Sequence, residues 1–137
     1  MLRTVLKSKI HGATVSGSKL HYVGSLTVDL DLLRAADILP GELVHVANVS
    51  NGARFETYTI AGEAGSGQMQ VNGAAARLAH AGDLIIVMSY GQYSARELVG
   101  HRPAIVQVDA ANAVRDVVRP APGAGAPAIR SPVASSM

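Results

Sequence analysis

Apolar and polar residues alternate along much of the chain, and this pattern predicts short β-strands. The clearest alternation covers Leu43–Val49, which is followed by Asn51-Gly52, a dipeptide typical of tight hairpin turns. Phe55–Ile60 alternates in the same way and predicts the returning strand of this hairpin. Similar patterns predict further strands at Leu2–Lys7, Ile10–Ser16, Leu20–Val23, Leu26–Leu30, Gln68–Val71, Leu84–Ser89 and Ala104–Val108.

The predicted helices are few and short. Asp31–Leu39 begins with a residue that favours helix caps and is followed by Pro40-Gly41, a typical stop signal. A second helix is predicted at the alanine-rich Gly73–Ala79, and Ser94 and Glu97 have the spacing of a capping box. Many short strands with few helices indicate a mainly β fold, and we expect a small β-barrel rather than an α/β sandwich.

The last 19 residues, 119–137, differ from the rest of the chain in composition. Fourteen of them are Pro, Gly, Ala or Ser, and none is aromatic. Such a segment buries too little apolar surface to offset the entropy of ordering, so we predict a disordered tail. The remaining 118 residues are a typical length for one domain, and we expect a single barrel over residues 1–118.

Composition excludes several classes of protein. The chain has no Cys, which rules out a disulfide scaffold, an iron–sulfur cluster and a thiol nucleophile. Aromatic residues are 4%, so the core must consist of aliphatic side chains and Met. The longest strongly apolar run, Leu84–Met88, is too short to cross a bilayer, and no apolar segment follows the N-terminal charges. No two of the five His have the spacing that is typical of metal ligands. We expect a soluble cytoplasmic protein without a metal.

The formal net charge of +2 hides an asymmetry along the chain. Residues 1–24 carry four cations and no acid, whereas residues 25–118 carry six Arg and all ten acids. A basic arm is one feature of DNA-binding proteins. Here its charges are interleaved with apolar positions, so we expect the arm to pack against the acidic remainder.

Four clusters carry the residues with chemical potential, although common motifs do not explain them. Gly62–Gly67 lacks the lysine of a phosphate-binding loop, and Ser25 is not in a G-x-S-x-G motif. The clusters, in chain order, are Lys7–His11, Leu20–Ser25, Asn51–Tyr58 and Val71–Ala76. In this combination and order the sequence closely resembles the aspartate 1-decarboxylases, pyruvoyl-dependent enzymes that make β-alanine for pantothenate biosynthesis. The resemblance extends from Met1 to about Val108.

The resemblance implies a fold and a maturation reaction. The fold is a six-stranded double-psi β-barrel, and the enzyme is a homotetramer with active sites between subunits. It is made as a proenzyme in which the Gly24–Ser25 bond cleaves itself. Ser25 then becomes an N-terminal pyruvoyl group, which replaces pyridoxal phosphate, and the chain is divided into residues 1–24 and 25–137. Glycine at position 24 is expected to allow a strained turn that a residue with a Cβ would resist.

The resemblance also implies the roles of individual residues. The Ser25-derived pyruvoyl forms a Schiff base with L-aspartate, and Tyr58 is the proton donor. Thr57 takes part in processing by donating to the oxyanion. Substrate binding falls to Lys9, Arg54, Thr57, Asn72, Gly73, Ala74 and Ala75. Lys9 and Arg54 suit the two carboxylates of the substrate. The roles of His11 and Tyr22 stay open, and Ala47 occupies a position where some relatives carry a bulky aromatic residue.

Two alternatives are non-enzymatic. Small psi-barrel folds also occur in DNA-binding regulators, which would need Arg3, Lys7 and Lys9 exposed on one face. A barrel that keeps the fold but never cleaves itself would act only as a subunit of an assembly. The expectation from the resemblance is an enzyme that binds neither nucleic acid nor membranes.

Overall fold

The computed structural model describes residues 1–121 of the 137-residue chain. Positions 122–137 of the tail predicted to be disordered lie outside the described residues. The described part contains two short α-helices, α1 (Leu30–Ala35) and α2 (Ala95–Leu98), and a 3-10 helix, η1 (Gly73–Arg77). Its strands are β1 (Arg3–Thr14), β2 (Gly17–Lys19), β3 (Ser25–Asp29), β4 (Leu43–Asn48), β5 (Arg54–Gly62), β6 (Met69–Asn72), β7 (Leu84–Tyr93), β8 (Ala104–Val108) and β9 (Val114–Val118).

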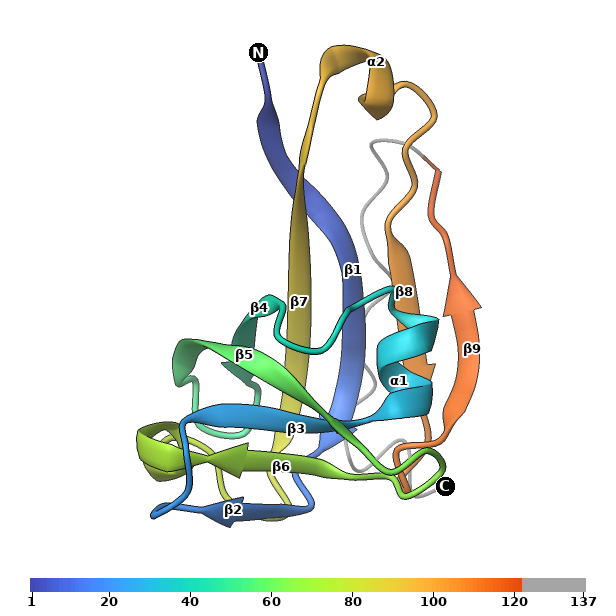
Figure 1. Ribbon diagram of the computed structural model, residues 1–137. Helices are drawn as coiled ribbons and strands as arrows, with labels where there is room; N and C mark the ends of the chain where they lie inside the picture. The colour runs from blue at the N-terminus through green and yellow to red at the C-terminus, as the bar shows by residue number, and fades with distance from the viewer. Residues whose placement is uncertain (122–137) are drawn as a thin grey trace.

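The strands form one strongly curled sheet in the order β2-β6-β3-β5-β4-β7-β1-β8-β9. β1 lies inside this strand order, whereas β2 lies at one end of it. Only Val15 and Ser16 separate the two strands along the chain. At this junction the Ser16 N–H donates to the Met69 carbonyl over 2.9 Å. Figure 1 shows β3, β5 and β6 running across the lower part of the long strands β1 and β7. The mainly β barrel expected from the sequence is confirmed, with nine strands in the described residues instead of six.

The core lies inside this curled sheet and is aliphatic, as the composition predicts. The side chains that are completely buried include Ile10 from β1, Leu26 from β3, Val44 from β4 and Ile85 from β7. Successive residues of a strand face opposite sides of a sheet, so the neighbours of these residues face outward. Within the described residues, no helix is long and apolar enough to cross a membrane.

Several strand predictions need correction. Most of Leu2–Lys7 and of Ile10–Ser16 belongs to one strand, β1, whose pairing with β7 shifts register twice. Leu20–Val23 is a turn rather than a strand, and its apolar side chains lie at the surface. Ala104–Val108 is not the last strand, because β9 follows it and pairs with it antiparallel. Most side chains of β9 are exposed, which explains why no alternation of apolar residues indicated it.

The first helix is shorter than predicted and begins differently. The N-cap is Asp29, not Asp31, and its carboxylate accepts a hydrogen bond from the Asp31 N–H over 2.8 Å. The same carboxylate accepts hydrogen bonds from the N–H groups of Gly65 and Gly67. One buried side chain therefore begins α1 and fixes the glycine-rich turn. The capping box predicted at Ser94 is confirmed at the start of α2.

Candidate active site

Ser25 is the first residue of β3 and is completely buried, although the turn before it is exposed. Its backbone pairs with that of Asn72 in the antiparallel register of β3 and β6. The Ser25 hydroxyl donates to the Val23 carbonyl and accepts from Asn72 Nδ2, each over 3.0 Å. The hydroxyl is thus held from two sides, directly after the bond whose cleavage the family resemblance implies.

Asn72 connects Ser25 to two further polar side chains. Its Nδ2 also donates to Thr27 Oγ1 over 3.0 Å, and its Oδ1 accepts from Gln70 Nε2 over 2.7 Å. We refer to Ser25, Thr27, Gln70 and Asn72 as the polar cluster. The cluster lies on the outer face of β3 and β6, because Leu26 and Val71 between its members face the core. Sequence reasoning singled out Ser25 and Asn72 and missed the other two.

At Gly73, directly after β6, the backbone lies close to the turn at residues 20–24 that precedes Ser25. Its φ is +73°, and a Cβ there would lie 2.6 Å from Gly24 Cα and 2.9 Å from Gly24 N. A residue other than glycine would therefore displace the turn. Gly24 itself lacks a positive φ, and a Cβ at Gly24 would meet no atom within 4 Å. The expected strain at Gly24 is thus not found, and the position that demands glycine is Gly73.

Tyr58 and Thr57 lie on β5, next to β3. Leu26 of β3 is level with Thr59 of β5 in a parallel register. One residue earlier, Ser25 is level with Tyr58, and alternation places both side chains on the outer face. Tyr58 is 39% exposed. Thr57 alternates to the other face, and its side chain makes no hydrogen bond in the part of the chain that the structure describes.

Lys9 and Arg54 lie on the outer face farther around the sheet. The registers of β1, β7, β4 and β5 place them in two adjacent rows: Lys9, Met88, His45 and Glu56 in one, and His11, Ile86, Ala47 and Arg54 in the other. The two cations are three strands apart, roughly 14 Å at the usual strand spacing. Among residues 1–121, no hydrogen bond or ion pair joins either cation to the polar cluster.

His11 and Tyr22, whose roles the sequence left open, have contrasting surroundings. Both ring nitrogens of His11 are buried, and neither has a hydrogen-bond partner in the described part of the chain. Burial, and secondarily the charge of Lys9, lowers the pKa of His11, which favours the neutral imidazole. Tyr22 is 51% exposed, and Lys19 Nζ lies 5.7 Å from the centre of its ring.

A family model described as aspartate decarboxylase matches residues 1–115. The chain belongs to this family. The match covers every strand of the described chain except the end of β9. The protein is therefore a carbon–carbon lyase, and the family supports aspartate decarboxylation as its activity. The four sequence clusters that indicated this family all lie within the matched residues.

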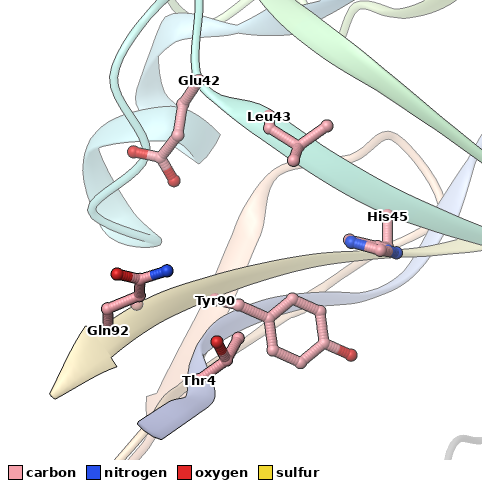
Figure 2. Close-up of a pocket in the computed structure, with 7 residues that line it drawn as sticks. Thr4, Glu42, Leu43, His45, Tyr90 and Gln92 are labelled. Atoms are coloured by element: carbon pink, nitrogen blue, oxygen red, sulfur yellow. The ribbon is translucent and has the colours of Figure 1, made fainter. Parts of the chain in front are cut away.

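The decarboxylase also has a pocket of about 410 Å³ that contains none of the predicted site residues. In Figure 2, Glu42 and Leu43 face Thr4, Tyr90 and Gln92 across this pocket. His45 lines it as well, with its ring edge-on to Tyr90 at 5.1 Å. We take the polar cluster rather than this pocket as the candidate active site, because the buried hydroxyl and its hydrogen bonds are found at the cluster.

One chain of the decarboxylase thus brings together only part of the predicted site. Ser25 and Asn72 are in direct contact, Gly24 lies against Gly73, and Tyr58 is level with Ser25. Ala74 and Ala75 follow Gly73 in η1, where Ala74 is exposed and Ala75 is half-buried. Lys9 and Arg54 are elsewhere on the outer face. Within residues 1–121, no three metal-ligating side chains gather into a candidate metal site.

Proposed function

We propose that the decarboxylase cleaves its own Gly24–Ser25 bond and converts Ser25 into a pyruvoyl group. The mature enzyme then converts L-aspartate to β-alanine and carbon dioxide, which supplies pantothenate and coenzyme A biosynthesis in the cytoplasm. The observation that carries this proposal is the Ser25 hydroxyl, buried at the start of a strand and bonded to Asn72 and the Val23 carbonyl. A surface serine in an ordinary turn would need neither the burial nor the amide partner.

Cleavage begins when Ser25 Oγ attacks the carbonyl carbon of Gly24. The C–N bond breaks, the amine takes up a proton, and Gly24 becomes an ester of Ser25 Oγ. Next, Ser25 Cα loses a proton and the Cβ–Oγ bond breaks, so that Gly24 leaves as a carboxylate that keeps Oγ. Water then replaces the nitrogen of the remaining enamine, ammonia leaves, and a ketone forms at the new N-terminus. Asn72 Nδ2 donates to Oγ and stabilises the negative charge that Oγ acquires.

The surroundings of Ser25 fit a pyruvoyl group. In the uncleaved chain Ser25 has no exposed surface, so bulk water is kept from this position until the Gly24–Ser25 bond opens. The ketone supplies an electron sink for the pair of electrons that carbon dioxide leaves behind. The backbone pairing of Ser25 with Asn72 holds this end of the chain, and Tyr58, level with Ser25, donates a proton to the substrate carbon. The side chains of Gly73, Ala74 and Ala75 are absent or small, so the protein backbone there can approach the substrate closely.

The two substrate carboxylates need cations, and we propose that a second copy of the chain supplies them. Arg54 offers a planar fork and Lys9 a point charge, yet both lie apart from Ser25 within one chain. Tyr58, Leu43 and Tyr90 form an exposed apolar row on the same outer face. Covering this row with other subunits accounts for the expected homotetramer with active sites between subunits. The proposed role of Thr57 in processing and substrate binding rests on the family resemblance, because within one chain its side chain lies on the face of β5 opposite to that of Ser25.

The structure gives less support to DNA binding. Lys7 Nζ donates to both oxygens of Glu42 and to the Asp37 carbonyl, so its charge is neutralised within the chain. The basic face that DNA binding requires would therefore lose one of its three cations. The intact mass of the purified protein distinguishes the enzyme from an assembly subunit that never cleaves itself.

Denaturing mass spectrometry of the purified protein tests the proposal. We expect two chains, residues 1–24 and 25–137, the second with an N-terminal pyruvoyl group. The Ser25→Ala variant should stay intact at 14.1 kDa and release no carbon dioxide from L-aspartate. An intact wild-type chain after prolonged incubation would refute self-cleavage. Carbon dioxide release by Ser25→Ala would refute the pyruvoyl role.

A further inference from the structure

We infer that Gln70 is a positioning residue for self-cleavage, an inference that rests on the proposed function. Its Nε2 donates to Asn72 Oδ1 over 2.7 Å, the shortest hydrogen bond within the polar cluster. Gln70 and Asn72 are two residues apart on β6, so their side chains lie on the same face. Gln70 touches neither Ser25 nor Gly24 through a hydrogen bond in the described residues. Its effect on them must pass through Asn72.

With Gln70 Nε2 as the donor to Oδ1, the Asn72 amide presents Nδ2 to Ser25. With Oδ1 turned toward Gln70, both protons of Nδ2 are used, one on Ser25 Oγ and one on Thr27 Oγ1. If the amide were reversed, Oδ1 would face the two hydroxyls and accept from them. The one proton of Ser25 would then be drawn from the Val23 carbonyl to Asn72. Because Asn72 is completely buried, no water can replace a partner lost on either side.

The orientation of Asn72 affects the elimination step most directly. In that step the Cβ–Oγ bond of Ser25 breaks, and the electron pair stays on Oγ, which leaves as part of the Gly24 carboxylate. A donor at Oγ stabilises this charge, whereas the carbonyl oxygen of a reversed amide would repel it. Gln70 therefore favours the orientation of Asn72 that assists the departure of Oγ. Sequence reasoning gave Gln70 no role, because the contact of its partner Asn72 with Ser25 follows only from the register of β6 with β3.

Four variants of Gln70 and Gln68 separate hydrogen-bond donation from simple packing. Gln70→Lys keeps a donor, Gln70→Met keeps bulk without a hydrogen bond, and Gln70→Glu offers only acceptors at pH 7. Gln68→Glu is the matched control, because Gln68 is two residues earlier and its side chain makes no hydrogen bond in residues 1–121.

Each chain is made by cell-free synthesis and quenched in denaturant at timed intervals. Intact mass gives the cleavage rate, and hydroxylamine treatment before the quench reveals accumulated ester. Circular dichroism melting reports stability.

We expect cleavage to slow in the order Lys, Met, Glu at position 70, by roughly ten- to a hundred-fold for Gln70→Glu, the usual scale for a hydrogen bond to a charged group. Ester should accumulate in Gln70→Glu, and Gln68→Glu should cleave at the wild-type rate. If wild type cleaves and Gln70→Glu cleaves equally fast, or if the rates follow melting temperature instead of donor capacity, the inference is wrong and the proposed function stands. If wild type does not cleave, both are overturned.

Discussion

At the scale of single residues, Gly73 is the position where one added carbon should disturb the site most. Gly73→Ala would place a Cβ 2.6 Å from Gly24 Cα, on a backbone whose φ of +73° already disfavours alanine. We expect the free energy of unfolding to fall by about 1–3 kcal/mol and self-cleavage to slow, because the turn before Ser25 must shift. Urea unfolding and timed intact-mass measurements would record the two effects.

Gly52→Ala is the control for this prediction. Gly52 has a similar φ of +80°, but a Cβ there would meet no atom within 4 Å. This variant should carry only the backbone strain, lose stability by about 1 kcal/mol and cleave normally. Equal cleavage rates for the two variants would show that the contact between Gly73 and Gly24 has no part in processing.

The residues of the site could be predicted from the sequence only where they belong to the four clusters that together carry the family resemblance. Ser25, Asn72 and Gly73 belong to recognisable clusters, and the structure brings them together. Thr27 and Gln70 are ordinary strand residues whose importance depends on the register of β3 with β6. A register is a long-range property, so no local pattern indicated them. For the same reason, strain was expected at Gly24 instead of at its neighbour in space, Gly73.

At the scale of elements, the link between β1 and the segment before β4 gives stability a dependence on pH. Glu42 accepts hydrogen bonds from Lys7, Ser89 and the Leu39 N–H. Burial alone would raise the pKa of Glu42, but the bonds from Ser89 and Lys7 outweigh it and lower this pKa below its usual value of 4.5. A lowered pKa in the folded state means that this contribution to stability is present above pH 4.5 and is lost as the pH falls through the lowered value.

Glu42→Gln tests this link. At pH 7 we expect the variant to be less stable than wild type by about 1.5–3 kcal/mol, the range for hydrogen bonds to a charged group. The difference should shrink from pH 4.5 toward pH 3, as Glu42 of wild type becomes protonated. Urea unfolding followed by circular dichroism suits a chain without Trp. Glu63→Gln is the control, since Glu63 is exposed and its carboxylate forms no ion pair within the described chain. A difference independent of pH would contradict the assignment.

Elements with a local signal were the ones that could be predicted from the sequence. The hairpin at Asn51-Gly52 joins β4 to β5, and the capping box at Ser94 begins α2. β9 lacked such a signal because its side chains are mostly exposed and it is held by backbone pairing with β8. Leu20–Val23 gave a false signal, since its apolar side chains are exposed in the single chain. For both β9 and Leu20–Val23, the exposure of the side chains depends on the rest of the fold, which the local sequence does not determine.

At the scale of the whole molecule, the predicted scissile bond divides two interleaved pieces. Residues 1–24 contain β1, which lies between β7 and β8, and β2, which pairs with β6. The same division separates the basic first segment from the acidic remainder. Either the shared sheet or the opposite charges could hold the pieces together after cleavage. Since β1 is paired on both sides and Ile10 is completely buried, the sheet should dominate.

Salt distinguishes the two explanations. In 1 M NaCl the screening length falls to about 3 Å, so attraction between exposed charges of the two pieces is largely removed. Backbone hydrogen bonds and apolar burial are not weakened in this way, and we expect both pieces to elute together from a size-exclusion column at low and high salt. They should separate in 6 M guanidinium chloride, which unfolds the sheet. The uncleaved Ser25→Ala chain serves as the reference for elution. Loss of the 24-residue piece in 1 M NaCl alone would show that charge, and not the position of β1 between β7 and β8, holds the mature enzyme together.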